Sequence, residues 1–359
     1  MRHLPRRRTA WVALLTVAVV AGGGAAWLRL MPARATTPTP VAGATTGAAV
    51  SLAAVTPTPA SGSLDPLSIA AMRARPYPAS TLLTVRTDGD RGGYVNSVVS
   101  FHSDGLTEDA LLSVPDGRRP AAGWPVIIIN HGYIAPASYV TDDASYAQFI
   151  ATYARAGYMV LKPDYRGHGQ SQGVAEGAYL SPVYAYDLLN LISTVRADPR
   201  VDPSRIGLFG HSMGGAEVLR ALVVSHDIRA AVFMAGVVGS FEDIFTWPHP
   251  VLPTDSAVPL QQGVAAAVVS ARGTPATDPA FWASASAVNF VASTTAAIQV
   301  DQDVGDSQVP KAFSDHLVSA LQAAGRSVEY LLYPGDDHQF TANRAAVLAN
   351  TLRFFRIHL

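Results

Sequence analysis

The amino-acid sequence predicts an α/β fold with an open, doubly wound and mostly parallel sheet, antiparallel strands at its N-terminal side and an inserted lid. Three observations lead to this prediction. From about residue 66, short apolar segments of strand length alternate with longer segments of helical periodicity. The first strand-like segments are joined by a tight-turn sequence, which is typical of an antiparallel hairpin. A stretch rich in aromatic residues and prolines then interrupts the alternation between residues 233 and 296.

The N-terminal strands come first. Residues 80–86 and 96–102 have strand-like composition, and Ser103-Asp104-Gly105 supplies a turn into the segment 110–114. Residues 126–129 read Val-Ile-Ile-Ile, the fully apolar pattern of a strand in the centre of a parallel sheet. The antiparallel part of the sheet is therefore expected to precede the parallel part.

The rest of the chain alternates between helices and strands. The segment 183–198 has helical periodicity, with Tyr184, Leu188 and Ile192 on one side. In a later helix, a proline lies near the first turn and a glycine follows the end, positions that suit both residue types. Further strands are predicted at 158–162, 206–209, 230–233, 296–300 and 328–333, and helices at 146–156, 183–198, from the residue after 212 to about 225, 310–324 and 345–357.

The insertion, at about residues 238–293, is expected to form a partly helical lid. It contains Phe241, Phe245, Trp247 and Trp282. Long insertions in compact domains commonly carry binding functions, so these aromatic side chains would cover a site. The alternative is that they extend the hydrophobic core.

The first 64 residues are not expected to belong to this fold. Four arginines within the first eight residues precede an apolar stretch at 10–28, a pattern typical of an export signal. Residues 1–35 would be removed as a signal peptide or would remain as an anchor on the outer face of the cytoplasmic membrane. Residues 36–64 are rich in Thr, Pro and Ala and are expected to form a flexible linker to the domain at 65–359.

Composition excludes several functions. The chain contains no cysteine, so disulfides, thiolate metal sites and cysteine catalysis are excluded. A net charge of −1 gives no electrostatic footprint for a nucleic-acid partner. No motif implies a metal or an organic cofactor. The expected partner is therefore a small-molecule substrate.

The most informative motif is Gly210-His211-Ser212-Met213-Gly214, which lies between a predicted strand and a predicted helix. A G-x-S-x-G sequence in this context is typical of a nucleophile elbow. The sharp turn leaves no room for side chains at the two glycine positions, and it exposes the Ser212 hydroxyl above the sheet. The sequence therefore predicts Ser212 as a catalytic nucleophile.

A serine nucleophile needs a base, which an acid must orient. The last predicted strand is followed by His338, which is the expected base. The strand before it ends in a loop that carries Asp301, Asp303 and Asp306. Asp306 is the expected acid, with the other two as alternatives. Because parallel strands place these loops at one edge of the sheet, all of them are expected to meet Ser212.

An oxyanion hole needs backbone N–H donors beside the nucleophile. The Met213 N–H lies at the start of the helix after the elbow. The Tyr133 N–H follows the central apolar strand, and Gly132 permits a close approach. A glycine-rich loop follows the next strand, and its Arg166 and His168 are expected to brace the site rather than react.

Five motifs, taken in order, resemble those of the α/β-hydrolases. They are His131-Gly132, Asp164-Tyr-Arg-Gly-His-Gly169, Gly210-His-Ser-Met-Gly-Gly215, Gly305-Asp-x-x-Val-Pro310 and Tyr333-Pro-Gly-x-x-His338. The resemblance covers the chain from about residue 80 and points to the catalytic domain of the prolyl oligopeptidases and to dienelactone hydrolase-like enzymes. It places the family's nucleophile, acid and base on Ser212, Asp306 and His338. Family members usually carry His-Gly before the acid loop, where this chain has Gln302-Asp303.

The resemblance implies a serine hydrolase that cleaves carboxylic esters through an acyl-enzyme intermediate. Within the enzyme class, the alternative is a serine peptidase of the prolyl oligopeptidase type that acts on short peptides. Outside that class, the alternative is a catalytically silent binding module of the cell envelope.

Overall fold

The computed structural model describes residues 65–177, 179–247 and 259–359. All of them belong to one compact unit, Pro59–Leu359. The predicted signal or anchor segment and the predicted linker lie outside the described residues, so export and membrane attachment stay predictions. In the part of the chain that is described, no helix is long and apolar enough to cross a bilayer.

The described residues form a nine-stranded sheet with the order β1-β2-β3-β5-β4-β6-β7-β8-β9. The pairs from β1 to β5 are antiparallel, and the pairs from β5 to β9 are parallel. This is the predicted mostly parallel sheet with antiparallel strands at its N-terminal side. The strands are β1 Leu83–Asp90, β2 Tyr94–Ser103, β3 Leu106–Pro115, β4 Trp124–Asn130, β5 Met159–Pro163, β6 Val201–His211, β7 Ala230–Met234, β8 Ala297–Asp303 and β9 Val328–Tyr333.

Strands β2 and β3 form the predicted hairpin. Their register is continuous, and Ser103 pairs with Leu106 at the tip. Asp104 and Gly105 between them have φ angles of 54° and 80°. These left-handed conformations are those of a tight two-residue hairpin turn.

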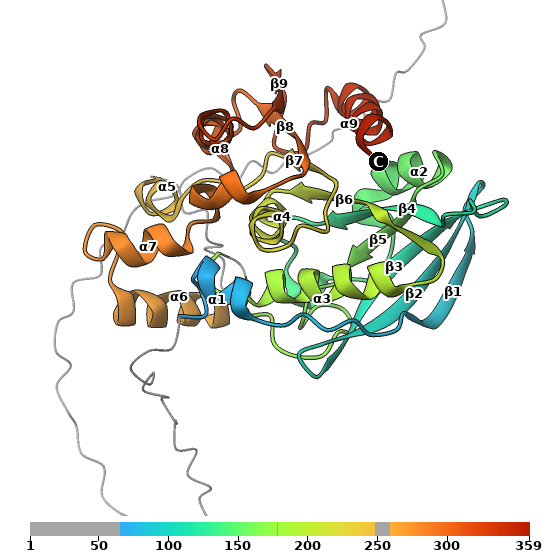
Figure 1. Ribbon diagram of the computed structural model, residues 1–359, viewed down its shortest axis with the longest axis horizontal. Helices are drawn as coiled ribbons and strands as arrows, with labels where there is room; N and C mark the ends of the chain where they lie inside the picture. The colour runs from blue at the N-terminus through green and yellow to red at the C-terminus, as the bar shows by residue number, and fades with distance from the viewer. Residues whose placement is uncertain (1–64, 178, 248–258) are drawn as a thin grey trace, which may run out of the picture. The chain divides into compact units, whose positions relative to one another are not determined.

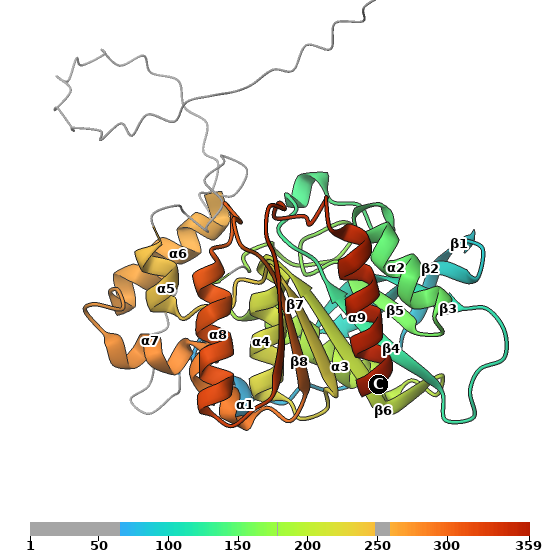
Figure 2. The ribbon, with the colours of Figure 1, turned by 90° about the horizontal axis from the view of Figure 1, so that it is seen from above.

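Helices cover both faces of the sheet (Figure 1 and Figure 2). Helices α2 and α9 pack together on one face. Helices α3, α4 and α8 cover the other face, where the short α1 packs against α4. Helix α1 is absent from the predictions because its six residues are too few to show a period. The bounds of these helices are α1 Ile69–Ala74, α2 Ala147–Arg155, α3 Val183–Ala197, α4 Met213–Val224, α8 Lys311–Ala323 and α9 Arg344–His358.

The central strand β4 contributes to both hydrophobic cores. Val126 and Ile128 pack with the α3 and α4 side, whereas Ile127 and Ile129 pack with the α2 and α9 side. All four side chains are fully buried. Because successive side chains of a strand point to opposite faces, a strand covered on both sides must be apolar throughout. This explains the uninterrupted Val-Ile-Ile-Ile sequence.

The insertion is largely helical, with α5 Phe241–Thr246, α6 Pro259–Arg272, α7 Pro279–Ala285 and the 3₁₀ segment Ala287–Ser293. Phe241 and Trp282 are buried with their ring centroids 4.9 Å apart, and Phe245 lies 5.0 Å from Trp282. These aromatic side chains therefore extend the core. That the insertion covers the site as a lid stays a prediction, and residues 248–258 lie outside the described part.

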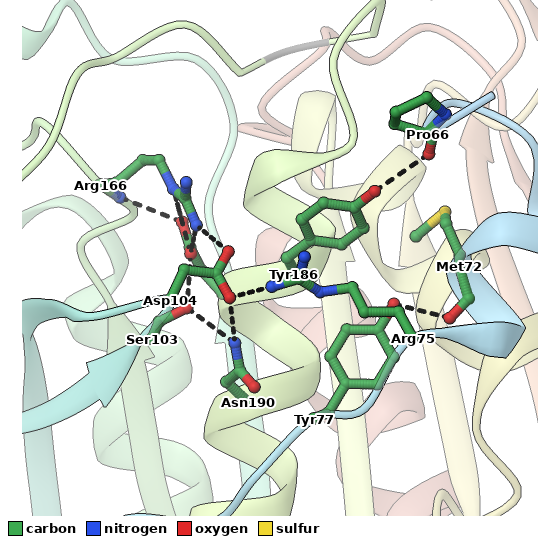
Figure 3. Close-up of polar contacts among 10 residues, drawn as sticks. Pro66, Met72, Arg75, Tyr77, Ser103, Asp104, Arg166, Tyr186 and Asn190 are labelled. Atoms are coloured by element: carbon green, nitrogen blue, oxygen red, sulfur yellow. Dashed lines mark hydrogen bonds and ion pairs between the residues drawn. The ribbon is translucent and has the colours of Figure 1, made fainter. Parts of the chain in front are cut away.

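A polar cluster fixes the loop that follows β5 (Figure 3). Arg166 of this loop donates a hydrogen bond from Nη2 to Oδ2 of Asp104 at the hairpin tip, at 3.0 Å. It donates a second one from Nε to Oδ2 of Asp187 of α3, also at 3.0 Å. Arg75 also pairs with Asp104, and its guanidinium carbon lies 4.2 Å from the ring centroid of Tyr186. Arg166 therefore anchors its loop to the hairpin and to α3.

Glu108 of β3 adds a protonated carboxyl group to this cluster. Its side chain is fully buried. Burial, together with the neighbouring Asp187 carboxylate, raises the pKa of Glu108 to about 10, far above its ordinary value of 4.5. The folded protein therefore holds a proton at neutral pH that the unfolded chain releases.

The substitution Glu108→Gln is expected to stabilise the protein, and more so at pH 8 than at pH 5. A raised carboxyl pKa makes the free energy of unfolding fall as the pH rises above 4.5, by at most about 1.4 kcal/mol per pH unit. Glutamine is neutral and has no such cost. Urea unfolding of both proteins at the two pH values measures the difference. A gain that is equal at both pH values would contradict the assignment of a neutral Glu108.

Candidate active site

The turn between β6 and α4 has the geometry of a nucleophile elbow. Ser212 lies between them with φ 54° and ψ −122°, a backbone conformation that is unfavourable for a residue with a side chain. A Cβ atom on Gly214 would lie 2.2 Å from the Asn130 carbonyl oxygen, and one on Gly210 would lie 2.8 Å from the Gly214 carbonyl oxygen. The glycines are therefore required by the close packing of the turn, as the motif predicts.

His338 and Asp306 form a buried pair at the carboxyl edge of the sheet. His338 Nδ1 lies 2.7 Å from Asp306 Oδ2. The other carboxylate oxygen accepts hydrogen bonds from the backbone amides of Gln308 at 2.8 Å and Val309 at 3.0 Å. Burial alone would raise the pKa of Asp306, but the hydrogen bonds from His338 and the two amides outweigh it and hold the pKa below its ordinary value. Asp306 is therefore ionised and orients the imidazole.

Asp301 and Asp303 do not contact His338. The expectation that both lie in the loop after β8 is wrong, because the strand continues to Asp303. Asp301 accepts hydrogen bonds from Tyr333 Oη at 3.0 Å and from Gln299 Nε2 at 2.7 Å. Asp303 accepts one from the Asp336 amide at 3.2 Å. Both carboxylates are buried, and their hydrogen bonds link β8 to β9 and to the loop that follows β9.

Ser212 and His338 line the same cavity, which has a volume of about 230 Å³. Among the described residues, no hydrogen bond joins the Ser212 hydroxyl to the imidazole. Such bonds are often long in unliganded enzymes and shorten when substrate binds. The lining residues are Gly132, Tyr133, Ile134, Ser145, Tyr146, His211, Ser212, Gln308, His338 and Gln339. The structure thus brings together the predicted nucleophile and base, with the acid directly behind the base.

One of the two predicted oxyanion donors lines this cavity, and the other adjoins a lining residue in sequence. Tyr133 lines it directly, and Met213 begins α4 immediately after Ser212. No side-chain hydrogen bond caps the N-terminus of this helix, which carries the positive end of the helix dipole and begins directly after Ser212. A Cβ atom on Gly132 would lie 3.0 Å from the Ser212 Cβ atom. Glycine at this position therefore allows the loop that carries Tyr133 to approach the nucleophile.

His168 packs against the loop that follows β4 and carries Tyr133. Its buried ring has its centroid 5.9 Å from that of His131 and 5.4 Å from that of Tyr139. Burial lowers the pKa of His168, so the ring is neutral and packs as a partly apolar group. This agrees with the expectation that His168 braces the site.

The sequence did not identify six of the lining residues, which are Ile134, Ser145, Tyr146, His211, Gln308 and Gln339. Gln308 and Gln339 adjoin the predicted acid and base, so their proximity in sequence was a usable signal. Tyr146 ends a 3₁₀ turn directly before α2, and nothing in the pattern around it indicates a site. His211 occupies a position of the elbow motif that tolerates many residues, and its two ring nitrogens hydrogen-bond to other loops of the site. Within the described residues, no group of three or more His, Asp or Glu side chains is placed to hold a metal ion.

Comparisons with known proteins show similarity to serine hydrolases. The family model described as serine aminopeptidase, S33, matches residues 125–254. Dipeptidyl peptidase family member 6 of Caenorhabditis elegans is 26% identical over 239 residues, which cover 63% of this chain and 30% of that protein. An uncharacterized 31.7 kDa protein of Escherichia coli is 28% identical over 129 residues, 35% of this chain and 42% of that protein. The chain thus spans less than half the length of these relatives.

Solved structures show the α/β-hydrolase fold. An acetyl xylan esterase from Paenibacillus sp. R4 superposes with a TM-score of 0.62 at 18% identity, covering 81% of this chain and 92% of that one. A putative dipeptidyl aminopeptidase IV from Bacteroides ovatus gives a TM-score of 0.59 at 18% identity, covering 76% and 37%. A puromycin-hydrolyzing peptidase from Mycobacterium tuberculosis gives 0.55 at 20% identity, covering 78% and 39%. Esterases and peptidases share this fold.

Proposed function

We propose that this chain, an α/β-hydrolase of the serine-hydrolase type, cleaves carboxylic esters with Ser212, His338 and Asp306 as its catalytic triad. The observation that carries the proposal is the buried His338–Asp306 pair at a cavity shared with Ser212, whose backbone is held in the elbow conformation. None of these features is sufficient alone. A strained serine, an oriented imidazole and an ionised carboxylate at one cavity have the arrangement that serine hydrolysis needs.

The hydrogen bond between His338 and Asp306 supports the following proposed mechanism. Asp306 accepts a hydrogen bond from Nδ1 of His338, which leaves Nε2 of the imidazole as the base. In the proposed reaction Nε2 takes the proton of Ser212 as the hydroxyl attacks the ester carbonyl. The backbone N–H groups of Tyr133 and Met213 stabilise the oxyanion. His338 then protonates the leaving alcohol, and a water molecule, activated by the same imidazole, releases the acid and regenerates Ser212.

A second candidate function is peptide hydrolysis, which the aminopeptidase family model and the peptidase relatives favour. An enzyme that recognises a peptide amino terminus needs carboxylates to pair with the ammonium group. Among the described residues that line the cavity there is no Asp or Glu. Among the described residues, this lining favours an ester over a peptide with a free amino terminus.

Activity assays on the full chain separate the two functions. We expect kcat/KM for a p-nitrophenyl ester to exceed that for an aminoacyl p-nitroanilide by more than about tenfold, or about 1.4 kcal/mol in transition-state stabilisation. Efficient anilide cleavage with negligible ester turnover would reverse the order. Labelling with a fluorophosphonate tests the third candidate, because a silent binding module would leave Ser212 unmodified.

A further inference from the structure

A chain of hydrogen bonds joins three loops of the candidate active site through His211, the residue before Ser212. The imidazole of His211 is buried, and its two nitrogens bind different loops. Nδ1 lies 2.8 Å from the hydroxyl oxygen of Tyr146, and Nε2 lies 3.1 Å from the carbonyl oxygen of His338. The Tyr146 hydroxyl oxygen in turn accepts a hydrogen bond from the Gly132 amide at 2.8 Å.

The hydrogen-bond partners determine which atom carries the proton in each of these three hydrogen bonds. A carbonyl oxygen only accepts, so His211 carries its proton on Nε2 and donates it to His338. Burial lowers the pKa of His211 to about 3, so the ring is neutral and Nδ1 is an acceptor. The Tyr146 hydroxyl, whose pKa burial raises, therefore donates to Nδ1 and accepts from Gly132. No donor or acceptor in the chain is mismatched.

These hydrogen bonds connect parts of the site that the sheet alone does not place together. Gly132 belongs to the loop after β4, next to the proposed oxyanion donor Tyr133. His338 belongs to the loop after β9, and two strands, β7 and β8, separate β9 from the elbow strand β6. Within its own loop the His338 backbone is organised by Asp336 and Asp337, which accept hydrogen bonds from neighbouring amides.

His211 links the elbow directly to the backbone of the base. The ring centroids of His211 and His338 are 4.9 Å apart, so the two imidazoles also pack against each other. A Cβ atom on Gly132 would lie 3.2 Å from His211 Nδ1, which shows how closely the loop after β4 approaches this ring. A shift of His211 would therefore change the positions of the base and of the oxyanion loop together.

We propose that His211 and Tyr146 are positioning residues that set the distance of His338 and of the oxyanion loop from Ser212. The inference rests on the proposed ester hydrolysis and adds to it a shared support for the base and the oxyanion donors. Because both residues also line the cavity, a comparison of kcat with KM separates this positioning role from direct contact with the substrate. Misplacement of reacting groups by fractions of an ångström lowers kcat while KM changes little.

The experiment compares four single variants of the full chain with the wild type on a p-nitrophenyl ester. Tyr146→Phe removes the hydroxyl, and His211→Leu removes both ring nitrogens. His211→Gln restores a donor and an acceptor. Tyr153→Phe is the matched control, because Tyr153 of α2 is also buried in the same core and its hydroxyl donates to Thr351 at 2.8 Å, away from the cavity.

We expect Tyr146→Phe and His211→Leu each to lower kcat by about 10- to 100-fold, with KM changed by less than about threefold. The double variant should lose little more than the worse single variant, because both residues belong to one chain of hydrogen bonds. His211→Gln should recover part of kcat. Tyr153→Phe should lower the thermal unfolding midpoint about as much as Tyr146→Phe does, and it should leave kcat within about twofold of the wild type.

Two results would overturn the proposal. One is wild-type kcat in folded Tyr146→Phe and His211→Leu. The other is a loss of kcat in Tyr153→Phe as large as theirs at the same unfolding midpoint, since that would make the effect one of general stability. Failure of the underlying function is distinguishable, because the wild type itself would then neither turn over esters nor be labelled at Ser212 by a fluorophosphonate.

Discussion

The variant Ser212→Ala is expected to lose at least about 10⁴-fold in kcat on a p-nitrophenyl ester. Alanine removes the oxygen that would form the acyl-enzyme, and no other hydroxyl occupies its place at the elbow. His338→Ala should lose a similar factor, because an unassisted serine hydroxyl is a weak nucleophile near neutral pH. The double variant should be little worse than either single variant, since nucleophile and base act as one unit. Initial rates at saturating ester measure all three.

A serine at the other end of the same helix provides the control. Ser225 directly follows the last residue of α4, and its hydroxyl accepts a hydrogen bond from the Asp227 amide at 3.2 Å. Ser225→Ala should keep kcat within about twofold of the wild type, because it leaves the elbow unchanged. Losses that multiply in the Ser212 and His338 double variant would show that the two residues act separately and would contradict the triad.

The second large effect is expected at Asp306. Asp306→Asn keeps the size of the side chain but removes the negative charge that would stabilise the imidazolium, so kcat should fall by about 10²- to 10⁴-fold. Asp303→Asn should cost less than about tenfold, because the asparagine oxygen can still accept the hydrogen bond from the Asp336 amide. Parallel kcat measurements on the two variants compare them directly. The reverse order of effects would transfer the role of the acid to Asp303.

Local patterns predict the architecture because they repeat over short distances. Alternating apolar strands and periodic helices reveal which face each residue covers, and the Asp104-Gly105 turn reveals the hairpin. The elbow is predictable for a similar reason, since its glycines are required by contacts within a few residues and with the neighbouring strand. His338 and Asp306 follow from the rule that parallel strands end at one edge.

The strand ends are less predictable. Strand β8 continues through Asp301 and Asp303, and these buried carboxylates break the apolar pattern on which the prediction of a strand depends. Strand β6 begins at Val201, five residues before the predicted start, because Val201 pairs with Trp124 across an irregularity in the register. Backbone pairing of polar residues leaves no periodic signal.

The links between loops cannot be predicted either. Tyr146 and Gly132 meet through a hydrogen bond, as do His211 and His338, and the second pair is separated by 127 positions in sequence. Such contacts depend on the twist of the sheet and on how each loop folds back, and a single sequence contains neither. The assignment of the oxyanion donors and the role of the insertion as a lid stay predictions for the same reason.

The left-handed backbone of Ser212 implies a trade-off between folding and reactivity. Glycine would adopt a φ of 54° without steric penalty, whereas this conformation costs serine on the order of 1–3 kcal/mol of folding stability. Selection for thermal stability alone would thus favour glycine at this position, which would remove the proposed nucleophile. A serine in this conformation is what the proposed role of Ser212 as nucleophile would require, at a cost in folding stability.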